Sequence, residues 1–328
     1  MVIITTIIIA ITLIVTQVNP INIMRDNFFI PKSQAEVLGV SEIIESSETQ
    51  VEDDIVFPSN GFPETGFRDA RPIKKFNVSV EPNVTANSAI VIDVKSKNIL
   101  FRKNIGEPSS IASITKLVTA LVVLDQNPDF NKKYIVRVED RREGGRIFIF
   151  QGDEVTINDL FNIVLVGSGN TATIALVHSL GISEQEFVNK MNEKALELGL
   201  NRTSFADPIG LSINNKSNAY EVAKILEVAL AQEKIKSTVT KSSYVLKTGQ
   251  GKQRIIESTD YLLKEKKNYN ILGGKTGYLG SAGFCFTGKF SNNNREIITV
   301  VLGSDSLDSR FSETDEIARW VYDNYIWP

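Results

Sequence analysis

The segment Leu117 to Leu124 is the feature that most constrains the fold, because every residue in it except Thr119 is apolar. A helix that is apolar on all sides is a buried helix, so the chain must build a core around this one. Pro108-Ser109-Ser110 before the segment and Asn127-Pro128 after it are typical start and stop signals of a helix. The sequence therefore predicts a buried helix near the centre of a sizeable domain.

Ser113 and Lys116 stand directly before this segment, so on a helix they share one face. A serine hydroxyl is a weak nucleophile until a neighbouring group takes its proton, and a lysine in an apolar pocket can lose its charge and act as that base. Near a helix N-terminus, backbone N–H groups also stabilise an oxyanion. The single histidine, His178, has no carboxylate beside it in the sequence, which argues against a Ser-His-Asp triad.

Ser168-Gly169-Asn170 lies between two segments of helical pattern, 157–166 and 171–180. A triplet of this composition is more often only a turn between helices. Its functional interpretation makes Ser168 a hydroxyl relay for protons and Asn170 an amide that holds a substrate backbone carbonyl.

The triplet Lys-Thr-Gly occurs twice. Lys247-Thr248-Gly249 lies between two strand-like runs and is typical of the polar turn of a β-hairpin. Lys275-Thr276-Gly277 is followed by a run of small residues, 280–283, whose glycines would let another segment approach the strand edge closely. There Thr276 would offer a hydroxyl and Lys275 a positive charge, which suits a substrate carboxylate.

Several classes of function are disfavoured by composition. The single cysteine, Cys285, rules out an intramolecular disulfide and a Cys-x-x-Cys metal site, and one histidine rules out a His-Glu-x-x-His zinc site. No phosphate-binding glycine loop is present, and the net charge of −3 without a basic cluster argues against a nucleic-acid partner. We therefore expect neither a metal nor a cofactor.

The chain divides into three parts. Residues 1–24 carry no charged side chain before Arg25 and are mostly apolar, which predicts an uncleaved N-terminal membrane anchor, with a secretory signal as the rival interpretation. Residues 25–86 mix acidic residues with Ser, Pro and Gly and predict a disordered linker. Residues 87–328 are long enough for one catalytic domain. This organisation predicts an extracytoplasmic protein, anchored in the membrane or secreted to the cell envelope.

The expected fold class is α/β. We expect an antiparallel sheet from the hairpin at 89–103 and from strands around 274–278, 283–289 and 296–303, with a C-terminal helix packed on it. The middle of the chain would form a mainly helical lobe, and a site would lie in the cleft between sheet and helices.

Ser-x-x-Lys, Ser-x-Asn and Lys-Thr-Gly, in that order, are the signature of penicillin-binding proteins and serine β-lactamases. With its neighbouring residues, the chain resembles the serine-type D-alanyl-D-alanine carboxypeptidases, the low-molecular-mass penicillin-binding proteins of the β-lactamase/transpeptidase-like superfamily. The resemblance runs from about Ser88 to about Tyr325. The segments that carry it are 89–101, 112–117, 166–170, 205–211, 259–263 and 274–278.

The resemblance implies a peptidoglycan stem peptide ending in D-Ala-D-Ala as substrate and β-lactam antibiotics as acylating ligands. It implies that Ser113 is the nucleophile and Lys116 its general base. Ser168 would relay protons and Asn170 would hold the peptide. The implied contacts to the terminal carboxylate are Lys275 and Thr276 in the Lys275-Thr276-Gly277 strand, and the implied oxyanion hole is formed by the backbone N–H groups of Ser113 and Tyr278.

Some features depart from the usual pattern or leave alternatives open. Tyr278 stands where many relatives carry histidine, although its backbone donor is retained. Arg310 is either a further carboxylate contact or, more simply, a surface arginine. A serine β-lactamase remains an alternative, although the loop 201–213 carries Asp207 and no glutamate. A D,D-endopeptidase and a catalytically silent wall-binding scaffold are the others. Peptide preference, β-lactam sensitivity and oligomeric state stay open.

Overall fold

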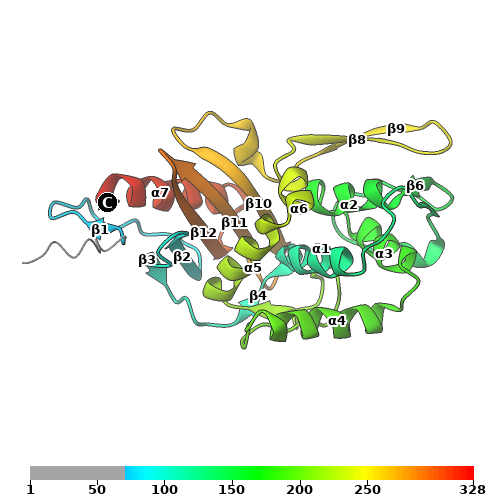
Figure 1. The fold of residues 1–328 in the computed structure, drawn as a ribbon, viewed down its shortest axis with the longest axis horizontal. Coiled ribbons are helices and arrows are strands. Elements are labelled where there is room, and N and C mark those ends of the chain that lie inside the picture. The colour runs from blue at the N-terminus through cyan, green and yellow to red at the C-terminus, as the bar shows by residue number, and fades with distance from the viewer. Residues whose placement is uncertain (1–70) are drawn as a thin grey trace, which may run out of the picture. The chain divides into compact units, whose positions relative to one another are not determined.

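The computed structural model describes residues 71–328, which belong to one compact unit. The expected anchor and most of the expected linker lie outside the described residues. A five-stranded antiparallel sheet, in the order β10-β11-β12-β2-β3, forms one half of this unit (Figure 1). Its strands are β2 (Ser88–Asp93), β3 (Ile99–Lys103), β10 (Asn270–Leu279), β11 (Gly283–Asn292) and β12 (Arg295–Ser304).

The two faces of the sheet are covered by different helices. Helix α7 (Leu307–Asn324) packs on one face, against β11 and β12, and α5 (Ala219–Ala231) packs on the other. Side chains alternate between the two sides as expected for a sheet buried on both faces. In β2, for example, Ala89 and Val91 join the core under α7, whereas Ile90 and Ile92 join the core of the helical lobe.

The middle of the chain forms the helical lobe. Its α-helices are α1 (Lys116–Asp125), α2 (Ile157–Val166), α3 (Asn170–Ser179), α4 (Glu184–Glu197), α5 and α6 (Glu233–Val239), and its 3₁₀ helices are η1 (Ala112–Thr115) and η2 (Val138–Asp140). Short strand pairs connect these helices: β4 (Ser109–Ser110) with β7 (Lys216–Ser217), and β5 (Lys133–Ile135) with β6 (Glu154–Thr156).

A separate hairpin of β8 (Ser243–Lys247) and β9 (Gln253–Glu257) follows α6, and η3 (Tyr261–Lys264) leads from it into β10. Lys247 ends the first strand, and Thr248 and Gly249 lie in the turn. The first Lys-Thr-Gly triplet is therefore at the hairpin turn, as predicted. Figure 1 shows this hairpin extending away from the sheet along the helical lobe.

Residues 71–86 fall in the range expected to be a linker, and the structure packs them on the domain. Strand β1 (Ile73–Lys74) pairs with β13 (Tyr325–Ile326) at the C-terminal end. Val84 and Ala86 are buried in the core under α7. The folded unit therefore includes residues before the expected boundary at residue 87.

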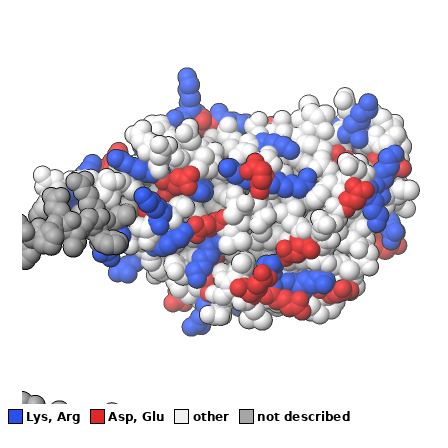
Figure 2. Space-filling view, viewed as in Figure 1, with Lys and Arg blue, Asp and Glu red and all other residues white. Residues whose placement is uncertain are grey.

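Across residues 71–328, no helix is both long enough and apolar enough to cross a bilayer. On the face shown in Figure 2, Lys and Arg side chains are interspersed with Asp and Glu side chains. That face therefore offers no extended patch of one sign, of the kind that binds nucleic acid.

Candidate active site

Ser113 lies in η1, one turn before α1, rather than on the α-helix that the sequence predicts. Ala112, at the start of this turn, has a φ of +46°, which no α-helix accommodates, so a helix cannot extend back past it. Residues i and i+3 of a 3₁₀ turn are eclipsed, so Ser113 and Lys116 still share one face. Gly210 packs against this turn, and a Cβ there would lie 2.0 Å from the Ala112 carbonyl oxygen.

Lys116 is fully buried, and its Nζ lies 2.8 Å from Ser113 Oγ. Two further oxygens contact the same nitrogen: Asn170 Oδ1 at 3.0 Å and the Ile209 carbonyl at 2.7 Å. Burial, together with the positive charge of Lys275, holds the pKa of Lys116 well below its usual range, although Asp207 acts in the opposite direction.

The three contacts fit Lys116 as an ammonium or as a neutral amine, and the lowered pKa favours the neutral form. An uncharged Lys116 has two N–H donors and one lone pair, and Asn170 Oδ1 and the Ile209 carbonyl can only accept hydrogen bonds. If both N–H groups of the neutral amine are given to these two oxygens, its lone pair is left for the hydroxyl of Ser113, and the lowered pKa of Lys116 favours this neutral form. The site can therefore deprotonate Ser113 without a histidine.

Asp207 shapes the loop that supplies the Ile209 carbonyl. Its Oδ1 accepts the backbone N–H groups of Ile209 at 2.7 Å and Gly210 at 2.6 Å. Its Oδ2 accepts the backbone N–H of Ser212. Both carboxylate oxygens are thus engaged by the loop backbone, so Asp207 is placed to hold Lys116 rather than to activate a water molecule.

Ser168 lies in the turn between α2 and α3, with a φ of +56°, and Asn170 begins α3. Asn170 is buried, and its Nδ2 donates to the carbonyls of Glu143 at 3.1 Å and Gly144 at 2.9 Å. The sequence predicts that this amide holds a substrate carbonyl. In the structure the same amide bridges Lys116 to the segment that follows η2.

Lys275 and Thr276 occupy the middle of β10 and face the Ser168 turn. Lys275 Nζ lies 2.9 Å from Ser168 Oγ, and burial lowers the pKa of Lys275 to about 7, with Arg310 acting in the same direction and Asp260 against it. The hydroxyl of Thr276 is 2.7 Å from that of Thr259. The structure thus brings all three predicted motifs into one site.

Gly277 allows β10 to approach the Ser113 turn. A Cβ at this position would lie 2.8 Å from the Ile111 carbonyl oxygen and 3.3 Å from the Cβ atoms of Ala112 and Cys285. The next residue, Tyr278, is exposed, so its backbone lies at the rim of the site. Cys285, on β11 behind the strand, is buried and free, as predicted.

A cleft of about 680 Å³ opens over Ser113 between the sheet edge and the helical lobe. Ser168, Asn170, Thr276 and Gly277 line it together with Arg310. The interpretation of Arg310 as a surface residue is wrong, because only 5% of it is exposed. Its Nη1 donates to the Gly277 carbonyl at 3.1 Å, and it packs against Phe284 and Phe311.

Sequence reasoning also missed Asp260, which is buried beside the Lys275 strand. A Cβ at Gly274 would lie 3.2 Å from Asp260 Oδ2, and this oxygen has no hydrogen-bond partner. Burial raises the pKa of Asp260 to about 7, and Arg310 and Lys275 act in the opposite direction. Among residues 71–328, no group of three or more His, Cys, Asp or Glu side chains could hold a metal ion.

Comparison with known proteins agrees with this geometry. Residues 75–306 match the family described as D-alanyl-D-alanine carboxypeptidase. The D-alanyl-D-alanine carboxypeptidase DacF of Bacillus subtilis is 32% identical over 73% of this chain, and the match spans 63% of that relative. A D-alanyl-D-alanine endopeptidase of Escherichia coli is 27% identical over 76% of this chain and 81% of the relative.

Solved structures show the same fold. The structure of a Streptomyces DD-transpeptidase superposes with a TM-score of 0.70 and 25% identity, covering 75% of this chain and all of that one. A D-alanyl-D-alanine carboxypeptidase from Mycobacterium tuberculosis gives a TM-score of 0.68 and 26% identity over 76% of this chain. The predicted fold class and the resemblance stated from the motifs are both confirmed.

Proposed function

The chain belongs to the D-alanyl-D-alanine carboxypeptidase family of serine peptidases, and on that premise we propose that it removes the terminal D-alanine from peptidoglycan stem peptides. The observation that carries this proposal is the buried Lys116 amine 2.8 Å from Ser113 Oγ, which also contacts Asn170 Oδ1 and the Ile209 carbonyl. The hydrolysis proceeds through an acyl-enzyme on Ser113.

In the acylation step, Ser113 Oγ attacks the carbonyl between the two D-alanines and its proton passes to Lys116. The oxyanion that forms is held by the backbone N–H groups of Ser113 and Tyr278, which the close approach at Gly277 brings together. Such donors contribute about two to three powers of ten in rate. The C–N bond then breaks, and the proton that Lys116 took from Ser113 reaches the departing amine through the hydroxyl of Ser168, which lies in contact with Lys275 and gives up one proton as it gains another. Water hydrolyses the acyl-enzyme.

The terminal carboxylate of the peptide binds where positive charge is concentrated. Lys275 and Arg310 are both buried at this side of the cleft, and Thr276 offers a hydroxyl. A carboxylate that enters the site stabilises the charged forms of Lys275 and Arg310, whose pKa values burial lowers. A peptide with a free terminal carboxylate is therefore favoured over a capped one.

β-Lactams acylate the same serine, because they present a strained amide and a carboxylate in the arrangement of D-Ala-D-Ala. The protein acts on the outer side of the cytoplasmic membrane, held there by the apolar segment 1–24 or released to the envelope. This location follows from the substrate and from the sequence of the N-terminal segment.

Cross-link cleavage is the second candidate function, because a relative matched over 81% of its length is named an endopeptidase. Both reactions use the same acylation chemistry and differ in the leaving group. A β-lactamase is disfavoured, since Asp207 is committed to backbone N–H groups and is not free to activate water.

Release of D-alanine from a synthetic pentapeptide that ends in D-Ala-D-Ala tests the proposal, with the full chain in detergent and Ser113→Ala as control. We expect release by the parent and none by Ser113→Ala. If the folded parent releases no D-alanine from the pentapeptide but cleaves a cross-linked dimer, endopeptidase activity replaces the proposal. If it does neither and hydrolyses penicillin with turnover, it is a β-lactamase. A folded parent that turns over none of them is a scaffold.

A further inference from the structure

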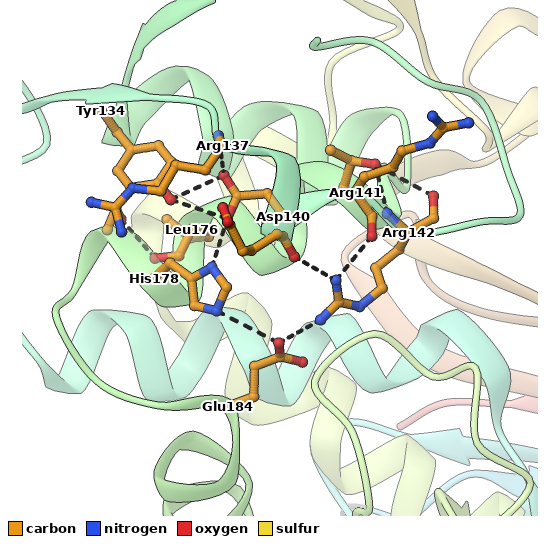
Figure 3. Close-up of polar contacts among 11 residues, drawn as sticks. Tyr134, Arg137, Asp140, Arg141, Arg142, Leu176, His178 and Glu184 are labelled. Atoms are coloured by element: carbon orange, nitrogen blue, oxygen red, sulfur yellow. Dashed lines mark hydrogen bonds and ion pairs between the residues drawn. The ribbon is translucent and has the colours of Figure 1, made fainter. Parts of the chain in front are cut away.

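The single histidine lies in a charged cluster outside the catalytic cleft. His178 is near the end of α3, the helix that begins with Asn170. Its Nδ1 lies 2.6 Å from Asp140 Oδ1, and its Nε2 lies 3.5 Å from Glu184 Oε1 (Figure 3). The ring therefore lies between two carboxylates that come from η2 and from α4, of which Asp140 is 38 residues away in the sequence.

Asp140 is the fixed end of this cluster. It is fully buried, and its carboxylate accepts hydrogen bonds from Tyr134 at 3.0 Å and from the backbone N–H of Arg137 at 2.8 Å. Burial and Asp140 raise the pKa of Tyr134, so the phenol stays protonated and remains a donor. Because Asp140 Oδ1 can only accept a hydrogen bond, Nδ1 of His178 carries a proton, and Nε2 is the ring nitrogen that faces Glu184.

Glu184 links the cluster to the segment that follows η2, residues 141–148. Its Oε1 forms an ion pair with Arg142 Nη2, as Figure 3 shows. Arg142 Nη1 donates to the carbonyls of Glu139 at 2.7 Å and Arg141 at 2.9 Å. Its backbone N–H donates to the Thr171 hydroxyl on α3 at 3.3 Å. Arg142 thus ties the start of the 141–148 segment to both α3 and α4.

The same segment forms one wall of the catalytic cleft. Gly144, Gly145, Arg146 and Phe148 line the cleft, and the carbonyls of Glu143 and Gly144 hold the amide of Asn170. Asn170 Oδ1 in turn accepts from Lys116. A continuous series of contacts therefore leads from His178 through Glu184, Arg142 and the 141–148 segment to the general base.

The geometry points to His178, Glu184 and Arg142 as positioning residues that latch the 141–148 segment onto the helical lobe and so fix Asn170 against Lys116. This inference rests on the proposed function only for its catalytic consequence. The charged or titratable groups around the ring are Asp140 of η2, Glu184 of α4, Arg142 of the segment, Arg137 before η2 and Tyr134 of β5.

Amide hydrogen exchange of residues 141–148 tests the latch without reference to activity. With the full chain in detergent at one fixed pH, we expect Glu184→Gln and Arg142→Met each to raise exchange of this segment about ten-fold. Arg142→Lys, which keeps the charge, should restore part of the protection. His178→Asn keeps a donor for Asp140 and loses contact with Glu184, so it should also raise exchange of this segment. Glu186→Gln is the matched control on α4, since Glu186 pairs with Lys190 at 4.0 Å.

Acylation by a fluorescent penicillin supplies the catalytic readout. We expect the acylation rate constant to fall about ten-fold in Glu184→Gln and Arg142→Met and to stay unchanged in Glu186→Gln. Exchange in Glu184→Gln and Arg142→Met within two-fold of the parent would overturn the latch. If the parent is acylated, and Glu184→Gln and Arg142→Met show raised exchange but the parental acylation rate, the latch does not position the general base. A folded parent that penicillin does not acylate would count against the proposed function, while the exchange data would still decide on the latch.

Discussion

At the scale of single residues, the site depends on charges that burial makes unfavourable. Lys116 and Lys275 are both buried, and one carboxylate raises the pKa of each: Asp207 acts on Lys116 and Asp260 on Lys275. The protein holds these two carboxylates in different ways. Asp207 is saturated with backbone N–H groups, whereas Asp260 has one oxygen without a partner. A buried carboxyl without partners takes up a proton at a pH at which an exposed one is ionised.

Asp260 should make the protein less stable as pH rises. Its pKa is raised to about 7, against about 3.9 in an unfolded chain, so between these values the folded state holds a proton that the unfolded state releases. The free energy of unfolding therefore falls from about pH 4 to about pH 7. In Asp260→Asn this fall in the free energy of unfolding should be smaller by more than about 1 kcal/mol.

Urea denaturation at pH 4.5 and pH 7 measures the fall, with Asp323→Asn, a change at an exposed carboxylate, as control. An unchanged pH dependence in Asp260→Asn would refute the assignment.

Arg310 should discriminate between free and capped peptides. Its guanidinium is buried beside the cleft and donates to the Gly277 carbonyl. A guanidinium can bind a carboxylate through two parallel hydrogen bonds. We expect Arg310→Lys to lower kcat/KM for a D-Ala-D-Ala peptide about ten-fold, because lysine keeps the charge but loses the bidentate contact. Arg310→Met loses both the contact and the charge and should lower kcat/KM about a hundred-fold. A peptide ending in D-alaninamide has no carboxylate and should lose less than three-fold. Equal losses on both peptides would show that Arg310 acts only through the strand.

At the scale of elements, the position of β10 against η1 is the critical contact. The strand carries Lys275 and Thr276, and the turn carries Ser113, so their separation sets the width of the oxyanion hole. Gly277 is the residue that permits the contact, since any Cβ would meet the Ile111 carbonyl.

Gly277→Ala should therefore impair catalysis more than folding. The new methyl group would force β10 away from η1 and misplace one backbone donor, for which losses of about 10²- to 10³-fold in kcat are typical. Gly280→Ala, three residues further along, is the matched control because a Cβ there meets nothing within 4 Å. Steady-state kinetics and thermal denaturation of both variants check this. Near-parental kcat in Gly277→Ala would contradict the proposed oxyanion hole.

Sequence patterns predicted the parts of the site that local chemistry determines. The helix at Lys116–Asp125, the hairpin turn at Thr248 and the three motifs are readable because spacing and composition fix them within a few residues. The burial of Arg310 and Asp260 was not readable, since it depends on how α7 and η3 pack on the sheet. Nor could a local pattern reveal that the backbone carbonyl of Glu143 accepts a hydrogen bond from the amide of Asn170, because every residue type has a backbone carbonyl.

At the scale of the whole molecule, the two ends of the described chain meet in a small sheet of their own. The segment 71–86 runs along α7, β1 pairs with β13, and Trp320 Nε1 donates to the Ser79 carbonyl at 3.2 Å. None of the residues that line the catalytic cleft belongs to this segment. The N-terminal segment therefore supports the scaffold and does not contact the chemistry.

A chain that begins at residue 87 should fold less stably than one that begins at residue 71. The buried Glu313 carboxylate accepts the backbone N–H groups of Thr85 at 2.6 Å and Ala86 at 3.3 Å, besides the Ser304 hydroxyl at 2.7 Å. Removing residues 71–86 leaves this charge with one partner and exposes apolar core, at a cost of roughly 3 to 5 kcal/mol in the free energy of unfolding. Glu313→Gln should recover part of that loss in the shortened chain, because a buried neutral amide that lacks hydrogen-bond partners destabilises the fold less than a buried carboxylate that lacks them.

Urea denaturation of the two chain lengths, each with and without Glu313→Gln, measures the coupling between the segment and this carboxylate. Equal stability of the two lengths would place the boundary of the domain at residue 87 after all.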